Sequence, residues 1–445
     1  MFYKNTNFLV AGLQKSGLSV SNYLLSKNAI VYIYDRRNTD EILKNAEEIV
    51  NNGGKLVENY ESVADIIDVL VISPGVPIDS EICKFYRSKG VRIIGEVELA
   101  CLEVNRPIVA VTGTNGKTTV CSLINNVLKT ASVKSVLCGN IGTPISSQIV
   151  SINNSEVCVL EISSFQLEST YLFYPHVAVI LNITQDHLER HYTMENYILV
   201  KSKILLTLKE SEFAILNYDD ENVRNLAKLT KAKVIWFSMK ENVNGAYIKD
   251  DFVYFNNEKI IELSKLQLTE PHNIQNVLAV ISIVKCLHID DEAIVKSLTT
   301  FKGVKHRFQK VKTKNQVTFI NDSKSTNPDS TINAVKSCTK NTILIVGGSD
   351  KGLDYTEMFL QIKNSSFIKN VIITGSVSNV MESYAIKENL DNYLVVKSFE
   401  NAIKSAYKLA DKNYQVLLSP GTASFDEFKN FEERGDKFVE IVESL

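Results

Sequence analysis

The sequence lacks the features of secreted, membrane-spanning and nucleic-acid-binding proteins. Its seven cysteines are dispersed and form no C-x-x-C pair, which is typical of reduced thiols in a cytosolic protein. No apolar run approaches the ~20 residues of a membrane span, and residues 1–5 lead into a strand-like run instead of a signal peptide. A formal net charge of -2 leaves no basic footprint for nucleic acid. We therefore expect a cytoplasmic protein that binds neither nucleic acid nor membrane.

Length and the order of apolar runs predict an α/β fold with several domains. A chain of 445 residues exceeds the size at which a single core stops growing, so two to four domains are expected. Strand-like and helix-like stretches alternate throughout, as they do in doubly wound parallel sheets. We expect domains over residues 1–104, 105–299 and 300–445.

The expected strands fall into three groups, one in each domain. Because ligands of open α/β sheets bind at the carboxyl ends of strands, the residues that follow these strands are the candidates for chemistry. A polar stretch at 240–265 is typical of peripheral hairpins, and a helix follows residues 271–273. The strands are expected at 8–11, 30–35, before 73–75, near 95, and at 108–112, 157–161, 177–182, 213–217, 233–237, 317–320, 342–346, 371–374 and 416–418.

The most informative motif is Thr112–Thr119, which follows an apolar strand and opens a helical pattern. In such a turn, backbone N–H groups and the positive end of the helix dipole point at one spot. Lys117 adds a full positive charge, and Thr118 supplies the hydroxyl that a phosphate-bound Mg²⁺ needs. Val111 stands where the strict G-x-x-x-x-G-K-[ST] pattern has glycine, so the alternative is a glycine turn with a surface lysine. The ordered strand, Gly-Lys-Thr and helix favour ATP.

Three further side chains of the central segment are candidates for the chemistry. Glu161 ends an apolar strand and is either a Mg²⁺ ligand or a cap of the next helix. His187 follows another strand beside Asn182 and Asp186, which makes it a candidate metal or substrate contact. Lys201 lies on a predicted helix, and by itself it is typical of a surface lysine.

A second nucleotide-like pattern lies near the N-terminus. The first strand ends in the turn Gly12–Gly17, and Asp35 closes the next strand. Such a pattern offers amides to a diphosphate and an acid to ribose hydroxyls. Gln14 replaces the second glycine of G-x-G-x-x-G, and Arg36–Arg37 favour anionic groups. A uridine diphosphate fits these features as well as NAD does, and an ordinary βα turn is the alternative.

The third segment has hydroxyls, lysines and glycines at three strand ends. These loops cover residues 321–328, 347–352 and 419–426. Each alone is consistent with simple loop chemistry. Three such loops on one sheet edge favour an acceptor that carries carboxylates.

Taken together, these motifs resemble the Mur ligases over nearly the whole chain, from about Gly12 to Arg434. The first motif is shared with folylpolyglutamate synthases, while the regions around 322–327 and 424–425 are similar to those of D-glutamate-adding members. The resemblance is carried by residues 112–119, 139–142, 161–168, 182–187, 306–308, 321–327, 419–420 and 431–435.

The resemblance implies an α/β protein with an N-terminal Rossmann-like domain, a central P-loop-type ATPase domain with a mostly parallel sheet, and a C-terminal Rossmann-like doubly wound domain. It implies an ATP-dependent ligase of peptidoglycan precursor synthesis that acts as a monomer. The expected substrates are UDP-N-acetylmuramoyl-L-alanine, D-glutamate and ATP, joined through an acyl phosphate.

The resemblance also implies the site residues. The expected catalytic residues are Lys117, Glu161, His187 and Lys201. Two Mg²⁺ ions are expected on Thr118, Glu161, His187 and a carbamylated Lys201. The expected ATP contacts are Gly113, Thr114, Asn115, Gly116, Lys117, Thr118, Thr119, Asn276, Arg307 and Asp322. The UDP-substrate contacts are expected to be Ser16, Asp35, Arg36, Arg37, Gly75 and Asn140, and those of D-glutamate Lys324, Thr326, Lys351, Ser424 and Phe425.

Some positions depart from the family pattern, and some alternatives stay open. Gln14 and Arg36 differ from the common family residues and leave the exact uridine contacts open, whereas Gly421–Thr422 is not expected to alter the chemistry. The nearest alternative is a ligase of the same mechanism that adds L-alanine, a diamino acid or a dipeptide, or that glutamylates folate. Alternatives from other classes are a nucleotide-dependent dehydrogenase and a non-catalytic NTP-binding regulator.

Overall fold

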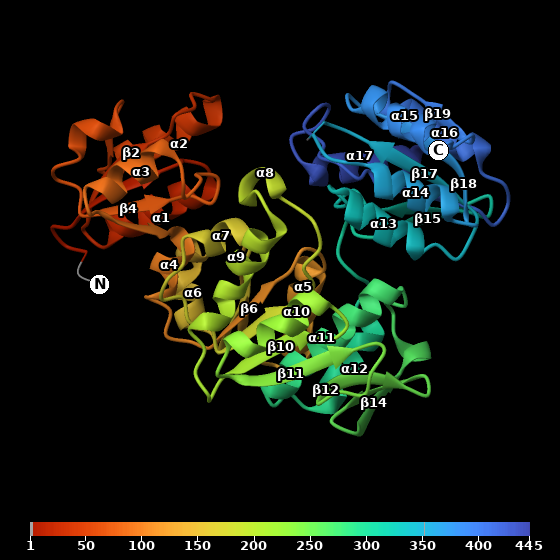
Figure 1. The fold of residues 1–445 in the computed structure, drawn as a ribbon, viewed down its shortest axis with the longest axis horizontal. Coiled ribbons are helices and arrows are strands. Elements are labelled where there is room, and N and C mark those ends of the chain that lie inside the picture. The colour runs from red at the N-terminus through yellow and green to blue at the C-terminus, as the bar shows by residue number, and fades with distance from the viewer. Residues whose placement is uncertain (1–2, 351) are drawn as a thin grey trace. The chain divides into compact units, whose positions relative to one another are not determined.

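The computed structural model describes residues 3–350 and 352–445 and divides the chain into two compact units (Figure 1). The first unit extends to Thr269 and includes Asn273–Phe301, and it holds two sheets. The second unit comprises Glu270–His272 and Lys302–Leu445 and holds a third sheet. The expected α/β class is confirmed, while the domain boundaries at 104/105 and 299/300 stay predictions.

The first sheet has five parallel strands in the order β3-β2-β1-β4-β5. The central strand β1 pairs with β2 and β4, so the strand order reverses beside it and a crevice is expected where β1 and β4 end. The elements, red to orange in Figure 1, are β1 (Asn7–Ala11), α1 (Lys15–Ser26), β2 (Ile30–Tyr34), α2 (Asp40–Asn51), β3 (Lys55–Leu56), η1 (Tyr60–Val63), β4 (Val69–Ile72), α3 (Glu81–Ser88), β5 (Arg92–Gly95) and α4 (Glu96–Cys101).

The second sheet has nine strands in the order β14-β13-β12-β11-β10-β9-β6-β8-β7. Its pairs are parallel except β12–β13 and β13–β14, which form the predicted peripheral hairpins. The strands are β6 (Ile108–Thr112), β7 (Ser135–Gly139), β8 (Val157–Glu161), β9 (Val177–Ile180), β10 (Phe213–Asn217), β11 (Lys233–Ser238), β12 (Gly245–Lys249), β13 (Phe252–Phe255) and β14 (Glu258–Glu262). The helices are α5 (Lys117–Thr130), η2 (Ile145–Gln148), α6 (Ile149–Asn153), α7 (Ser164–Glu168), α8 (Leu188–His191), α9 (Met194–Leu206), α10 (Glu221–Asn225), η3 (Leu226–Leu229), η4 (Leu263–Lys265), α11 (Pro271–Cys286) and α12 (Asp291–Thr300).

Helices cover both faces of this second sheet. Successive side chains of a strand point to opposite faces. Accordingly, Val109 and Val111 of β6 belong to one apolar cluster, with α5, α11 and α12, and Ile108 and Ala110 belong to another, with α7 and α9. Because both faces are buried, β6 is a continuous apolar run without polar alternation.

The second unit holds a sheet of six strands in the order β15-β16-β20-β17-β18-β19. The edge strand β15 is antiparallel to β16, and the other pairs are parallel. The strands are β15 (Gln309–Lys314), β16 (Val317–Asn321), β17 (Thr342–Gly347), β18 (Ile368–Thr374), β19 (Tyr393–Val395) and β20 (Gln415–Leu418). The helices are α13 (Pro328–Lys336), α14 (Thr356–Asn364), α15 (Ser378–Lys387), α16 (Phe399–Leu409) and α17 (Phe431–Ser444).

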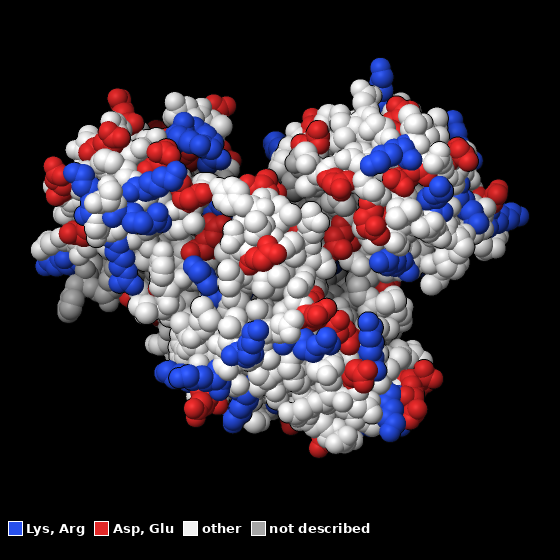
Figure 2. Space-filling view, in the orientation of Figure 1, with Lys and Arg blue, Asp and Glu red and all other residues white. Residues whose placement is uncertain are grey.

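Every strand expected from the sequence is present, but β3, β7, β15 and β19 were not predicted, and β7 lies in the central sheet. Only Cys138 of its five residues is buried, so this edge strand lacks the apolar signal of its neighbours. Across residues 3–350 and 352–445, the structure has no helix with the length and apolar character of a membrane span. Acidic and basic side chains alternate on the visible surface of each unit, in keeping with the net charge of -2 (Figure 2).

Candidate active site

The glycine turn after β6 forms an anion cradle. Gly116 has a left-handed backbone (φ 88°) and is the residue before α5. A Cβ there would lie 2.4 Å from Oδ1 of Asn276, so only glycine fits. Lys117 Nζ donates to the carbonyls of Gly113 and Thr114, at 2.8 Å each, and so lies over the turn. The predicted strand, turn and helix are confirmed, and Asn276 on α11 lies against the turn.

The segment after β9 holds this turn in place. The amide of Thr114 donates to the carbonyl of Asn182 at 2.9 Å, and the amide of Asn115 donates to the Asn182 side chain at 2.8 Å. In return, the amide of Thr184 donates to Oγ1 of Thr114 at 3.0 Å. The turn is therefore preorganised by bonds to its neighbouring strand end.

Glu161 is the last residue of β8, paired in register with Val111 of β6. Its side chain is buried, and Oε1 accepts a hydrogen bond of 2.8 Å from Nδ2 of Asn140. The other oxygen, Oε2, is buried and has no hydrogen-bond partner among the described residues. The alternative role as a helix cap is wrong, because Ser163 caps α7. An unpaired buried carboxylate oxygen beside a phosphate turn fits a hard divalent cation.

Lys201 is not a surface lysine. It lies on α9 with 1% of its surface exposed, and its Nζ donates to the carbonyl of Gly113 at 2.8 Å. The ammonium also lies 4.7 Å from the centre of the Tyr197 ring. Burial, reinforced by the positive charge of Lys117, lowers the pKa of Lys201 well below its usual value, although Asp186 opposes the shift. Lys201 therefore touches the same turn as Lys117 and tends toward a neutral amine.

His187 precedes α8 and, like Lys117, is half-buried. Its backbone is left-handed (φ 55°), and its ring lies 4.7 Å from the ring of Phe165. Nε2 lies 3.5 Å from Asp186 Oδ2, and Nδ1 lies 3.4 Å from Glu189 Oε1. Within the part of the chain that the structure describes, no group of three His, Cys, Asp or Glu side chains is placed to hold a metal. The metal set of Thr118, Glu161, His187 and Lys201 stays a prediction.

The N-terminal turn is stabilised by Asp35. A Cβ at Gly17 would lie 1.8 Å from the carbonyl oxygen of Gly12, so the turn requires glycine there. Asp35 accepts bonds from the amide of Leu13 at 2.8 Å and from the amide and guanidinium of Arg37 at 3.0–3.1 Å. Burial opposes ionisation of Asp35, but these bonds outweigh it and lower the pKa of the carboxyl.

Asp35 thus has all its acceptor positions engaged by the protein. Of the other predicted UDP contacts, Ser16 is half-buried and Arg36 and Gly75 are exposed. Asn140 lies apart from these in the chain and bonds to Glu161. The UDP roles of these residues stay predictions.

In the second unit, the predicted ATP contact Arg307 precedes β15, whereas Asp322 and the described D-glutamate contacts follow β16 or β20. Asp322 accepts bonds from the amide of Phe308 at 3.0 Å and from the hydroxyl of Ser419 at 2.9 Å. Burial raises the pKa of Asp322 to about 6, although the hydroxyl of Ser325 and the charge of Arg307 oppose the shift. Thr326 is half-buried and Ser424 is buried, whereas Phe425 is 72% exposed. Lys324 Nζ lies 5.2 Å from the centre of the Phe431 ring. Lys351 lies outside the described residues.

Comparison with known proteins identifies the family. Family models match residues 6–95 (Mur ligase MurD-like, N-terminal domain), 111–284 (Mur ligase middle domain) and 306–421 (Mur ligase, glutamate ligase domain). The UDP-N-acetylmuramoylalanine–D-glutamate ligases of Clostridioides difficile and Bacillus subtilis are 40% and 36% identical over 453 and 449 residues. Those matches cover 100% of this chain and 100% and 99% of the relatives. The chain belongs to the Mur ligase family.

Solved structures agree with this Mur ligase fold. MurF from Acinetobacter baumannii matches with a TM-score of 0.63 at 15% identity, covering 93% of this chain and 91% of that one. A pseudomurein peptide ligase type C from Methanothermus fervidus matches with a TM-score of 0.62 at 20% identity, covering 99% and 100%. At this identity the likeness shows the fold, and it confirms the predicted α/β architecture.

Sequence reasoning assigned no role to two arginines of this Mur ligase, the buried Arg434 and the half-buried Arg190. Arg434, 1% exposed, donates to Oγ and O of Ser323 and to the carbonyls of Thr422 and Ala423, at 2.8–3.3 Å. It thereby joins the loops after β16 and β20 that carry the predicted D-glutamate contacts. In the first unit, Arg190 on α8 bonds to the Glu168 carboxylate and to the carbonyls of Pro74 and Val76. Both arginines lie in polar stretches of the sequence, and their hydrogen-bond partners lie in other segments of the chain. Composition alone therefore does not indicate these contacts.

Proposed function

We propose that this Mur ligase is an ATP-dependent ligase that joins D-glutamate to UDP-N-acetylmuramoyl-L-alanine. The observation that carries the proposal is the match along the whole chain to relatives that bear this name, together with a preorganised phosphate turn. We place the reaction in the cytoplasm, where the seven free cysteines would stay reduced. We also propose a monomer, with domains over residues 1–104, 105–299 and 300–445.

The reaction must turn a poor electrophile into a good one. A carboxylate resists attack by an amine, and its oxygen is a poor leaving group. Transfer of the γ-phosphoryl group of ATP to the alanine carboxylate forms an acyl phosphate and ADP. The amine of D-glutamate then attacks the carbonyl carbon, the C–O bond to phosphate breaks, and the amine loses a proton. The products are the amide, ADP and phosphate.

The first unit supplies what phosphoryl transfer requires, which is positioning and charge stabilisation. The amides of the glycine turn and the N-terminus of α5 would bind the phosphates, and Lys117 would move from its carbonyl partners to the γ-phosphoryl group. Asn276, which lies against Gly116, is placed to contact the nucleotide. Arg307 and Asp322, which belong to the second unit, are proposed as further ATP contacts.

Mg²⁺ would neutralise the charge of the triphosphate as it meets a carboxylate. The residues present fit such an ion, because Glu161 keeps one buried carboxylate oxygen without a partner among the described residues. We propose Thr118, Glu161, His187 and a carbamylated Lys201 as its ligands, with two ions bound. Lys201 fits this role because a neutral amine is the form that adds CO₂, and burial favours that form.

The two substrate sites are proposed mainly at the carboxyl ends of strands, one in the N-terminal sheet and one in the sheet of the second unit. For the UDP-muramoyl substrate they are the turns at Gly12–Gly17 and Gly75, together with the pair Arg36–Arg37 and Asn140. For D-glutamate they are the loops after β16, β17 and β20, which include Lys324, Thr326, Lys351, Ser424 and Phe425. Asp35 would act indirectly in this account, because its carboxylate holds Arg37 and the glycine turn in place.

The proposal is tested by measuring phosphate release. With ATP, Mg²⁺ and UDP-N-acetylmuramoyl-L-alanine present, adding D-glutamate should start phosphate release, and no other amino acid should do so comparably. A preference for L-alanine, a diamino acid or a dipeptide would assign the chain to another step. ATP binding without amino-acid-dependent release would indicate a regulator, and hydride exchange with a nicotinamide would indicate a dehydrogenase.

A further inference from the structure

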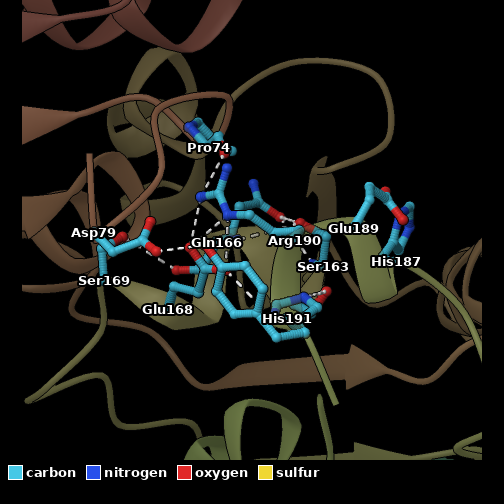
Figure 3. Close-up of polar contacts among 12 residues, drawn as sticks. Pro74, Asp79, Ser163, Gln166, Glu168, Ser169, His187, Glu189, Arg190 and His191 are labelled. Carbon is cyan, nitrogen blue, oxygen red and sulfur yellow. Dashed lines mark hydrogen bonds and ion pairs between the residues drawn. The ribbon is translucent and has the colours of Figure 1, made fainter. Parts of the chain in front are cut away.

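Arg190 is a half-buried charge that forms a two-point ion pair. Its side chain is 12% exposed, and Nε and Nη2 donate to the carboxylate of Glu168 on α7, at 3.0 Å to Oε1 and 2.5 Å to Oε2. Figure 3 shows the guanidinium between this carboxylate and Pro74. Glu168 is itself buried, with 6% of its side chain exposed. The pair is therefore shielded from water, where charge-assisted hydrogen bonds are strong.

The same guanidinium reaches the N-terminal sheet of the first unit. Nη2 donates to the carbonyls of Pro74 and Val76, at 3.4 and 3.1 Å. These carbonyls flank Gly75. A Cβ at Gly75 would meet no atom within 4 Å, so the space beside this residue is open. The hydroxyl of Ser73 donates to the carbonyl of Gly12 at 2.6 Å, so this turn is joined to the N-terminal glycine turn.

Arg190 also contacts the segment that carries the ATP-side groups. Its guanidinium carbon lies 4.9 Å from the centre of the Phe165 ring, and that ring lies 4.7 Å from the ring of His187. Phe165 and Glu168 belong to α7, which begins three residues after Glu161. One side chain therefore touches the turn proposed for the UDP substrate and the segment proposed for phosphoryl transfer.

We propose that Arg190 is a positioning residue that holds the Pro74–Val76 turn at a fixed distance from α7, so that the muramoyl carboxylate is presented to the phosphoryl group. This inference rests on the proposed function. Arg190 makes these contacts from two nitrogens of one rigid plane, Nε and Nη2. Lysine carries its donors on a single nitrogen and therefore cannot reproduce the two-point contact with the carboxylate while it also bonds to the carbonyls. The side-chain hydrogen bonds of Arg190 go to Glu168, Pro74 and Val76, and none goes to the glycine turn at 113–117.

The test is Arg190→Lys in the full chain, with Tyr192→Phe as the matched control. Tyr192 donates to Asp79 at 2.6 Å and so also bridges α8 and the N-terminal sheet, but it is exposed and does not touch the turn. For Arg190→Lys, we expect the KM for UDP-N-acetylmuramoyl-L-alanine to rise about tenfold or more, as the loss of one charged hydrogen bond implies. Binding of a non-hydrolysable ATP analogue alone should stay within about twofold of wild type. Tyr192→Phe should leave both values unchanged.

A double variant, Arg190→Gln with Glu168→Gln, keeps the inference falsifiable if the lysine variant folds poorly. It removes both charges at once, so no unpaired buried ion remains, and it should show the same selective loss of UDP-substrate affinity. An unchanged KM in either folded variant, or a loss of ATP affinity parallel to the rise in KM, would overturn the inference. Calorimetry of UDP-muramoyl-alanine binding to wild type separates the two proposals. No binding there overturns the proposed function and this inference, whereas wild-type binding with equal binding by the variants overturns the inference alone.

Discussion

Glu161→Gln gives the sharpest prediction, because activity should fall while the free energy of unfolding does not. The substitution keeps the shape of the side chain and the Oε1 acceptor that Asn140 uses at 2.8 Å, and it replaces the oxygen that has no partner among the described residues. If that oxygen binds Mg²⁺, kcat should fall about a hundred- to a thousandfold, which corresponds to about 2.7–4 kcal/mol of transition-state stabilisation. The Mg²⁺ concentration for half-maximal activity should rise.

The free energy of unfolding should not fall in this variant. Leaving a buried polar group unsatisfied costs about 1–3 kcal/mol, and in the metal-free protein Glu161 already carries that cost. Glu98 is the matched control, since it is buried and accepts bonds from the amides of Tyr171 and Leu172 at 3.1 and 2.8 Å. Glu98→Gln should lower stability by about 1–3 kcal/mol and leave kcat near wild type.

The assays are steady-state phosphate release against Mg²⁺ concentration and urea unfolding of both variants without metal. The reasoning is refuted if Glu161→Gln keeps wild-type kcat and Mg²⁺ dependence. It is equally refuted if Glu161→Gln is destabilised as much as Glu98→Gln, since Oε2 would then support the fold.

Three further predictions follow from the same geometry. Lys117→Ala should lower kcat by about a hundredfold to several orders of magnitude, and near-wild-type phosphate release would remove the ATP assignment. Lys201→Ala should raise the Mg²⁺ concentration needed for half-maximal activity, and its effect on the midpoint of urea unfolding should be smaller. An unchanged Mg²⁺ dependence would mean that this buried amine has no role at the metal. The Asp322 carboxyl should lower the free energy of unfolding as pH rises from its ordinary pKa of 3.8 to its folded pKa of about 6. In that range the folded state keeps the proton, whereas the unfolded state loses it. Over this range the free energy of unfolding should fall by about 3 kcal/mol. Asp322→Asn should therefore gain stability relative to wild type from pH 4 to 7 in urea unfolding, and a constant difference would contradict the shift.

The local parts of the fold and site were predictable from the sequence. The phosphate turn is encoded within eight residues, Thr112–Thr119, whose glycines, lysine and hydroxyls in that order are typical of a phosphate-binding turn. Apolar runs predicted the buried strands, because a sheet covered on both faces needs no polar alternation. The edge strand β7 carries no such signal, since only one of its residues is buried.

Long-range contacts could not be predicted from composition or spacing. Lys201 looks like any other helical lysine until α9 places it against Gly113, 88 residues earlier. Asn276 reaches Gly116 only through the packing of α11, and it entered the predicted site through the family resemblance alone. Arg434 bonds mainly to backbone carbonyls, which every sequence offers. Arg190 bonds to Glu168, 22 residues earlier, and to two backbone carbonyls, so nothing local distinguishes either arginine from a solvent-exposed one.

The central claim is that ATP activates the muramoyl-alanine carboxylate by phosphorylation at the glycine turn. The direct measurement uses UDP-N-acetylmuramoyl-L-alanine labelled with ¹⁸O in that carboxylate, followed by mass spectrometry of the released phosphate. An acyl phosphate predicts one ¹⁸O atom in each phosphate released with D-glutamate, and none in a Lys117→Ala background that has lost turnover. Phosphate that leaves wild type without label, while the amide product forms, would contradict the account.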